Sequence, residues 1–224
     1  MPSSSIEDYL KAIYHLSQAS QQVKTKAIAE RMDVSSPSVT AMLRTLSGLG
    51  YVDYEAYRGA SLTEPGTHAA LRVIRNHRLL EAFLVRTLGY GWDEVHAEAE
   101  RLEHAVSDNL IDRIDAFLSH PAFDPHGDPI PKADGRLPLR RAEPLPAFDH
   151  GTHVRVVRVL DQDPAVLRHL NTLGLVPGTE VTVLGPDPFG GPFRVRHDGA
   201  DVLLGQELAL RVMATNELAT DSLS

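Results

Sequence analysis

The chain has 224 residues, contains no cysteine and carries a formal net charge of −8 at pH 7. The absence of cysteine excludes disulfides, thiolate zinc sites and a cysteine nucleophile, and the length fits two or three modest domains. No segment approaches the ~18 apolar residues that a membrane span needs, and the first residues lack a signal-peptide pattern. We therefore expect a cytoplasmic protein that does not associate with membranes.

The first 64 residues have the pattern of a winged helix-turn-helix unit. Apolar residues recur at helical spacing, short turns separate the helices, and two extended runs joined by a four-residue turn predict a β-hairpin. The expected elements are helices at 5–19, at 25–32 and from Pro37, with Ser36 as its N-cap, to Gly48 or Gly50, and strands at 51–55 and 60–63.

Helical patterns continue beyond the hairpin and then give way to a proline-rich stretch. Helices are expected at 65–88, 92–107 and 108–118, followed by a linker within 120–150. Short apolar runs then alternate with turns at 154–160, 180–184, 193–195, 202–204 and 208–212, with one helix at 164–173. Several short strands in some sixty residues predict a small β-barrel. The last residues, 219–224, are expected to be disordered.

The second helix of a helix-turn-helix unit places its N-terminal residues in the major groove of DNA. Short hydroxyl side chains can reach base edges there, and basic side chains on neighbouring helices or the hairpin tip can meet phosphates. The expected DNA-binding residues are Lys26, Ser35, Ser36, Pro37, Ser38, Thr40, Arg44, Tyr57 and Arg58. A good helix start would by itself also explain the Ser-Ser-Pro-Ser sequence.

Histidines and carboxylates recur at helical spacing in the middle of the chain. His77 and Glu81 share one face of a predicted helix, and His96, Glu100 and the pair at 103–104 lie near one face of the next. Such spacings let imidazole nitrogens and carboxylate oxygens converge on a metal ion, although a solvated acidic face is the alternative. Zincin, di-iron, phosphate-loop and nucleophile-elbow motifs are absent. We therefore expect a metal sensor and not an enzyme.

Taken together, these features resemble the diphtheria-toxin-repressor family of iron- and manganese-dependent transcriptional regulators. The resemblance rests on the reader at 25–63 and on segments 6–10, 77–81, 96–104, 127–131 and 173–178. The last segment is a marker of the SH3-like barrel in the longer members. The resemblance implies a mainly α fold with a winged helix-turn-helix at 1–64, a helical metal-binding and dimerisation domain at 65–135, a proline-rich linker at 136–150 and an SH3-like domain at 151–215.

The family resemblance also implies two metal sites per subunit. The primary, activating site would be formed by Asp8, Glu100, Glu103 and His104. The second would be formed by His77, Glu81 and His96, completed from the barrel by Asp161, Gln162 or Asp163. Carboxylates stand where iron-type members have methionine and cysteine, so the oxygen-rich set favours Mn²⁺, with Fe²⁺ as the alternative. Lys11 stands where short manganese-type members have an acidic residue, so two separated ions are expected rather than a bridged pair.

The implied function is that of a metal-dependent repressor of metal-uptake genes. A metal ion bound to residues from two domains would orient two recognition helices of a homodimer for a palindromic operator. The dimer surface is expected on the 92–118 helices, or else their apolar residues form intrachain core; the candidates are Trp92, Leu102, Val106, Leu110, Ile111 and Ile114. Alternative functions are an Fe²⁺-responsive regulator, a metal-dependent hydrolase and a winged-helix protein that binds a small organic ligand through its barrel.

Overall fold

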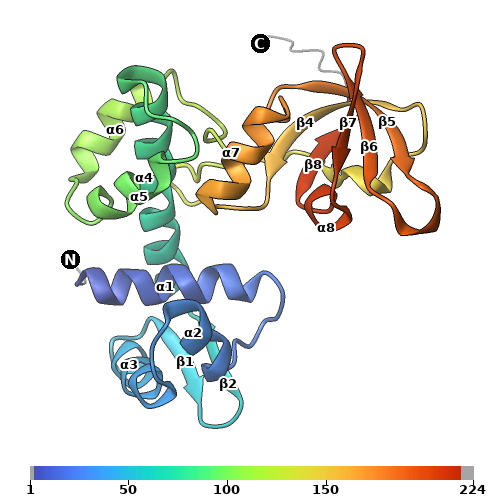
Figure 1. The fold of residues 1–224 in the computed structure, drawn as a ribbon. Helices are drawn as coiled ribbons and strands as arrows, with labels where there is room; N and C mark the ends of the chain where they lie inside the picture. Colours follow the sequence, from blue (N-terminus) through green and yellow to red (C-terminus); the bar gives the residue numbers. More distant parts are fainter. Residues whose placement is uncertain (1–2, 218–224) are drawn as a thin grey trace. The chain divides into compact units, whose positions relative to one another are not determined.

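The computed structural model describes residues 3–217, so the segment 219–224 that the sequence predicts to be disordered lies outside the described residues. The chain forms two compact units (Figure 1). Unit 1 contains residues up to 77 together with 100–113 and 131–137, and unit 2 contains 78–99, 114–130 and the residues from 138 onward. Each unit has its own hydrophobic core.

The N-terminal part of unit 1 is a winged helix-turn-helix, as the sequence predicts. Its elements are α1 (Ser4–Ser17), α2 (Thr25–Met32), α3 (Ser36–Gly48), β1 (Val52–Glu55) and β2 (Gly59–Leu62). The two strands form an antiparallel hairpin, and Val23 joins the hairpin through a bridge to Ala60. Leu10, Ile28 and Leu43, one from each helix, are fully buried in the core between the helices and the wing.

The start of α3 differs by one residue from the prediction. The helix begins at Ser36, and Ser35 rather than Ser36 is the N-cap. Ser35 has an extended backbone, and its hydroxyl accepts a hydrogen bond of 3.3 Å from the backbone N–H of Ser38. Pro37 therefore lies in the first turn, where its missing N–H costs no helical hydrogen bond.

Three further helices follow the wing: α4 (Glu64–Leu88), α5 (Val95–Leu102) and α6 (Asp108–Phe117). The expected helix at 92–107 is thus shorter at both ends. At its start, the carbonyl of Gly91 accepts hydrogen bonds from the N–H groups of Glu94 and Val95, which forms a turn, and Trp92 packs against the core of the C-terminal sheet. Ile111 and Ile114, two dimer-surface candidates, are instead 2% and 6% exposed within the chain.

The C-terminal part of unit 2 is a six-stranded antiparallel sheet with strand order β3-β8-β4-β5-β6-β7 (Figure 1). Alternate residues of β4 and β5, among them Val154, Val156 and Val183, are fully buried with Leu167 and Leu170 of α7. The elements are β3 (Glu143–Pro144), η1 (Leu145–Ala147), β4 (His153–Val159), α7 (Pro164–Thr172), β5 (Glu180–Pro186), η2 (Pro188–Gly190), β6 (Phe193–His197), β7 (Ala200–Leu204), α8 (Gln206–Ala209) and β8 (Val212–Thr215).

Two expectations for this region are wrong in detail. The run 208–212 is not a strand, because residues 206–209 form the short helix α8 and β8 begins only at Val212. The proline-rich stretch 136–150 is not only a linker, because it contains β3, which pairs with β8, and Leu145, which is fully buried. Among the described residues, no helix is long and apolar enough to cross a membrane.

Candidate metal centre

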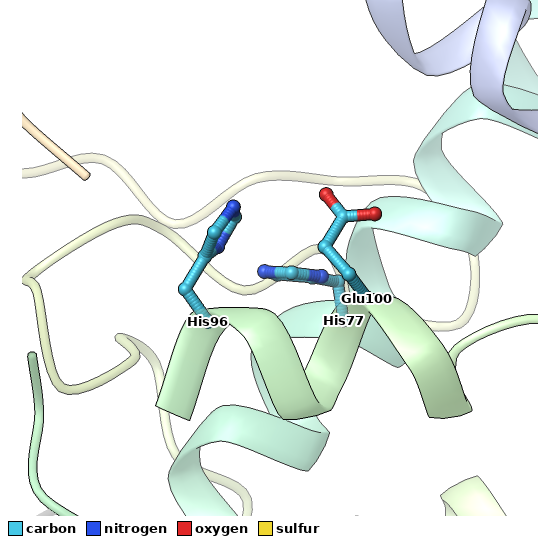
Figure 2. Close-up of side chains that lie close together, drawn as sticks. All are labelled: His77, His96 and Glu100. Carbon is cyan, nitrogen blue, oxygen red and sulfur yellow. The ribbon is translucent and has the colours of Figure 1, made fainter. Parts of the chain in front are cut away.

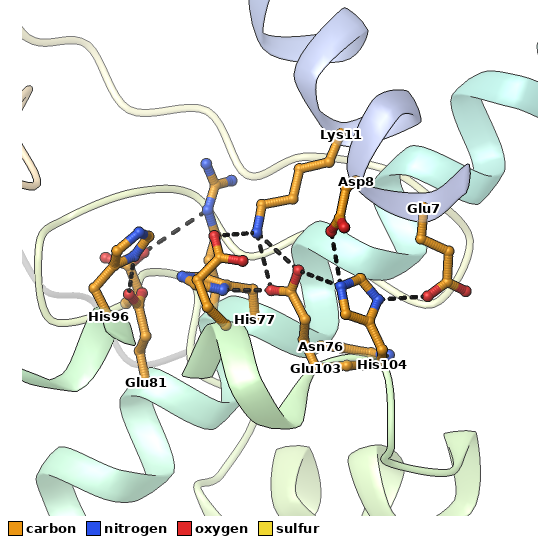
Figure 3. A network of polar contacts seen from close by, with 12 residues as sticks. Glu7, Asp8, Lys11, Asn76, His77, Glu81, His96, Glu103 and His104 are labelled. Carbon is orange, nitrogen blue, oxygen red and sulfur yellow. Dashed lines mark hydrogen bonds and ion pairs between the residues drawn. The ribbon is translucent and has the colours of Figure 1, made fainter. Parts of the chain in front are cut away.

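Asp8, Glu103 and His104, three of the four residues expected at the primary site, lie close together within unit 1. Asp8 lies on α1, whereas Glu103 and His104 follow the end of α5. The His104 Nε2 atom lies 2.8 Å from Asp8 Oδ1 and 3.4 Å from Glu103 Oε1 (Figure 3). One potential ligand atom from each residue lies within 4.8 Å of the other two, so the three side chains can hold one metal ion.

Lys11 lies between this cluster and Glu100, the fourth expected ligand. Its ammonium lies 2.8 Å from Glu100 Oε1 and 2.8 and 3.0 Å from the two carboxylate oxygens of Glu103. Lys11 follows Asp8 by one turn of α1, so both side chains reach the same cluster (Figure 3). Glu100, the fourth expected ligand, is thus paired with an internal cation, and the group formed by Asp8, Glu103 and His104 does not include it.

Glu7 orients the imidazole of His104, a role that the sequence did not reveal. Its Oε2 atom lies 2.6 Å from His104 Nδ1, which leaves the other ring nitrogen facing Asp8 and Glu103. Glu7 is only 6% exposed, and Arg72 holds its other oxygen at 3.3 Å. A carboxylate behind a histidine ligand is a common way to fix the ring and its tautomer. The sequence does not indicate this role, because Glu7 is adjacent to Asp8 and adjacent residues do not share a face of a helix.

The electrostatics of this cluster favour protonation in the absence of a metal ion. Burial raises the pKa of Asp8, and the charges of Glu103 and Glu100 add to the effect, while His104 opposes it. Burial by itself would lower the pKa of His104, but the hydrogen bond with Glu7 and the charges of Asp8 and Glu103 outweigh burial, so this pKa is raised. A divalent cation would relieve the same excess of negative charge.

The residues expected to form the second site do not all contact one another: His77 contacts Glu103 of the first cluster, whereas Glu81 contacts His96. His77 on α4 lies beside Glu100 (Figure 2), and its Nδ1 atom is 2.5 Å from Glu103 Oε2, so it belongs to the surroundings of the first cluster. Glu81 follows His77 by one turn of α4 and lies 3.2 Å from His96 Nδ1. His96 in turn precedes Glu100 by one turn of α5 (Figure 2).

A further group of potential ligands lies entirely within unit 2 and is formed by Glu81, Asp124 and His126. All three are buried, and His126 Nδ1 is 3.6 Å from Glu81 Oε2. Neither His126 Nδ1 nor Asp124 Oδ2 has a hydrogen-bond partner among the described residues. Buried polar atoms without partners are rare in native proteins, and a metal ion is one explanation for them. These donors therefore fit a cation.

The charges in this second group also favour a cation. Burial raises the pKa of Asp124, and the neighbouring carboxylates of Asp128 and Glu81 raise it further. Burial opposes the charging of His126, yet the nearby carboxylate of Glu81 raises the pKa of His126 to about 9. Asp124 and His126 were missed at the sequence level because they lie in a loop without helical spacing. The only signal was their position next to segment 127–131, which carries part of the family resemblance.

The loop that bears Asp124 and His126 is fixed by its neighbours in unit 2. Asp124 Oδ1 accepts hydrogen bonds of 2.8 and 2.9 Å from the backbone N–H groups of His126 and Asp128. Arg158 of β4 pairs with Asp128 at 2.5 Å, and the backbone N–H of Val159 donates to the carbonyl of His126. The second group is thus positioned by α4 on one side and by β4 of the C-terminal sheet on the other.

The structure does not bring the expected barrel ligands into either group. Asp161 pairs with Arg211, and Asp163 is the N-cap of α7, where its carboxylate accepts a hydrogen bond of 2.7 Å from Ala165 N–H. Among the described residues, the groups able to hold a metal ion do not include Asp161, Gln162 or Asp163.

The expected DNA-binding residues lie at the surface of the reader. Lys26 is on α2, Ser35 to Arg44 lie at and along the start of α3, and Tyr57 and Arg58 lie at the tip of the wing. Tyr57 is fully exposed in a left-handed conformation with φ 67°, and Arg58 pairs with Glu55 at 3.1 Å. The hydroxyls of Ser38 and Thr40 hydrogen-bond within α3 or its cap; Ser38 is exposed and Thr40 is half-buried.

Three family models match successive parts of the chain. An iron dependent repressor N-terminal DNA binding domain matches residues 1–60, and an iron dependent repressor metal binding and dimerisation domain matches residues 63–132. A FeoA domain matches residues 143–216. The three matches follow the same order as the reader, the helices α4 to α6 and the C-terminal sheet.

Similar proteins and structures extend over most of the chain. It is 35% identical over 219 residues to the iron-dependent repressor IdeR of Mycobacterium tuberculosis, a match that covers 91% of this chain and 93% of that protein. It is 39% identical over 120 residues to the transcriptional regulator MntR of Oceanobacillus iheyensis, covering 54% and 81%. A solved manganese-dependent transcriptional repressor in complex with manganese matches with a TM-score of 0.84 and 45% identity, covering 94% of this chain and 99% of that one.

Proposed function

The chain belongs to the family of iron- and manganese-dependent transcriptional repressors, and we propose that it is a Mn²⁺-activated repressor of metal-uptake genes. The observation that supports this most directly is the convergence of Asp8 from the reader with Glu103 and His104 from the metal-binding domain. The proposal includes a homodimer bound to a palindromic operator, which accords with a reader domain and a dimerisation domain on one chain.

We propose two metal sites per subunit. The primary ion would be held by Asp8, Glu103 and His104, with Glu100 as a fourth ligand once Lys11 moves away from it. For the second ion, the unpartnered atoms of His126 and Asp124 favour a set built on Glu81 and the loop 124–128. His96 contacts Glu81 and would complete that set, whereas His77 contacts Glu103 and would stabilise the primary site.

The ion would supply two positive charges that hold mutually repelling carboxylates together. Without it, burial and, to a smaller extent, the charges of Glu103 and Glu100 raise the pKa of Asp8. A metal ion therefore stabilises the arrangement in which α1 is fixed against the residues that follow α5. By linkage, operator DNA that selects this arrangement raises metal affinity by the same factor.

The proposed function is tested by the choice of metal. Asp8 and Glu100 provide hard oxygen donors, so Mn²⁺ should activate operator binding at a lower free concentration than Fe²⁺. The general affinity series runs the other way, so this preference must come from ligand type and geometry. The double change Asp8→Met with Glu100→Cys should reverse it. The measurement is an anaerobic operator-binding titration with each metal and with chelator, and equal activation of both proteins by both metals contradicts the assignment.

Metal activation should weaken as the pH falls. The pKa of His104 is raised above its ordinary 6.5, and this ring must lose its proton before it can bind an ion. Affinity for Mn²⁺ should therefore be full above the raised pKa and should decrease by about tenfold per pH unit below it for each proton displaced. Calorimetric Mn²⁺ titrations between about pH 8 and pH 6 measure this slope; a flat profile speaks against His104 as a ligand.

The reader residues should separate into two classes. Ser38→Ala should change the preferred operator sequence, at a cost of about 1 kcal/mol on the best site. Lys26→Ala should weaken binding to every sequence and lower the salt slope by about one. Footprinting should show an imperfect palindrome with half-sites about 10 bp apart or a multiple of that. Arg136→Ala, an exposed arginine paired with Asp134 outside the reader, is the matched control; protection of an asymmetric site by a monomer contradicts the proposal.

A further inference from the structure

The tip of the wing is held by a contact from outside its hairpin. β1 and β2 form a two-stranded ladder whose last residue pair is Glu55 with Gly59, so residues 56–58 extend beyond it. An isolated two-stranded hairpin is at best marginally stable in water. Tyr57 adds to the difficulty, because its left-handed backbone, with φ 67°, is unfavourable for a residue that has a side chain. A fixed wing tip therefore needs support from the rest of the reader.

The segment before α2 provides that support. The backbone N–H of Val23 donates to the carbonyl of Ala60 at 2.8 Å, and the N–H of Ala60 donates back to the carbonyl of Val23 at 2.9 Å, so this segment pairs with β2 next to the tip. The next residue, Lys24, extends its side chain to the tip itself. There its ammonium donates a hydrogen bond of 2.9 Å to the carbonyl of Arg58.

Lys24 also belongs to the helix-turn-helix. It is the N-cap residue of α2, and Ile28 of α2 is fully buried in one core with Leu43 of α3. The side chain of Lys24 therefore links the two elements of the reader that are expected to contact DNA, the helix α3 and the wing. A lysine in a DNA reader is usually assigned to a phosphate. Here the ammonium is already bound to the backbone of the protein itself.

We propose that Lys24 is a positioning residue for DNA binding. It holds the wing tip, and with it the exposed side chains of Tyr57 and Arg58, in place relative to α3. The effect of Lys24 on operator affinity passes through the wing and not through a phosphate contact of its own. Where it concerns DNA, this proposal rests on the proposed function, whereas the contact that fixes the wing exists in the protein without DNA.

The first experiment is a double-mutant cycle on operator affinity with the full-length, Mn²⁺-loaded protein. Lys24→Met removes the donor and the charge of the side chain, and the combined change Tyr57→Ala with Arg58→Ala removes what the wing tip offers to DNA. Alone, Lys24→Met should weaken operator binding by about fivefold, which is the contribution of one hydrogen bond. In the background without the two wing-tip side chains it should have no further effect, because contributions that act through one another do not add.

Lys26→Met is the matched comparison for this cycle. Lys26 is an exposed lysine of α2 that pairs with Glu30 of the same helix at 3.7 Å. Its loss should weaken operator binding by the same factor with and without the wing-tip side chains, as expected of a direct phosphate contact.

The second experiment needs neither DNA nor metal. Amide hydrogen exchange of the free, full-length protein reports how often a hydrogen-bonded segment opens. The amide of Arg58 donates to the carbonyl of Glu55 at 3.1 Å across the wing tip, so its exchange follows the opening of the tip. Lys24→Met should accelerate this exchange by about fivefold. Lys26→Met should leave it unchanged.

Two results overturn the proposal. The first is that Lys24→Met and the wing-tip changes have additive effects on operator affinity, which would assign Lys24 to a phosphate. The second is that the Arg58 amide exchanges equally fast in Lys24→Met and in the unmodified protein. Absence of operator binding by the unmodified protein would overturn the proposed function and with it the role in DNA binding, whereas faster exchange of the Arg58 amide in Lys24→Met would still support the contact with the wing.

Discussion

Replacing Asp8 or Glu103 by alanine is expected to abolish the response of operator binding to Mn²⁺ and to leave the fold intact. Each change removes one ligand of a three-residue cluster, so Mn²⁺ affinity should fall by at least about a hundredfold, equivalent to about 2.7 kcal/mol. Asp8 is the cleaner probe because its side chain is 38% exposed. Glu103 is fully buried, and its loss also removes one of the two carboxylates that pair with Lys11 and a contact of His77.

The measurement for both variants is an operator-binding titration at fixed protein and increasing Mn²⁺, with thermal unfolding as the check on folding. Asp134→Ala is the matched control, because Asp134 is an exposed acid of the same unit that pairs with Arg136 away from the cluster. Glu103→Gln keeps the shape and removes the charge, so it separates a lost ligand from a lost core contact. If Asp8→Ala and Glu103→Ala both respond to metal like the unmodified protein, the primary site lies elsewhere.

The change Gly127→Ala is expected to destabilise the chain by at least about 3 kcal/mol. A Cβ atom at Gly127 would lie 1.9 Å from the backbone carbonyl oxygen of Val157, and the backbone there has φ +86°. Neither the left-handed conformation nor the collision with β4 can be relieved by a side-chain movement. The loop would have to leave β4, and Asp124 and His126 would move with it.

A second glycine provides the control for this prediction. Gly151 also has a left-handed backbone, with φ +85°, but a Cβ atom there would have nothing within 4 Å. Gly151→Ala should therefore cost only the conformational part, about 1–2 kcal/mol. Chemical denaturation of both variants gives the two free energies of unfolding. Equal losses in the two proteins would show that the contact with Val157 does not hold the loop.

Much of the fold can be predicted from periodicity because local rules dominate there. The winged helix follows from apolar spacing and a serine-proline helix start, and the error at its cap is one residue. The prediction fails where distant contacts decide the structure. Trp92 has a helical neighbourhood but packs into the C-terminal core, and Leu145 lies in a proline-rich stretch but is buried there. The run 208–212 has an extended pattern, but its first residues belong to the helical turn 206–209 that precedes β8.

The residues of the candidate site also fall into those that the sequence reveals and those that only the folded structure reveals. Glu103 and His104 can be found from the sequence because they continue the spacing of His96 and Glu100, although in the structure both follow the end of α5. Glu7 could not be found, because its role depends on how α1 meets the residues after α5. Asp124 and His126 could not be found either, because only the folded loop brings them to Glu81. The spacing of His77 and Glu81 places both on one face of α4, but it does not reveal that His77 contacts Glu103 while Glu81 contacts His96.

In the proposed primary site, Lys11 competes with the metal ion for the same carboxylates. Its ammonium already bridges Glu100 and Glu103, so a metal ion must displace this ammonium before both carboxylates can coordinate it. The competitor is part of the chain, and its local concentration is therefore set by the geometry of α1 and not by the surrounding medium. An internal competitor of constant strength raises the free metal concentration at which half of the sites fill. Lys11 thus sets a threshold in free metal concentration, and concentrations below this threshold leave the protein inactive.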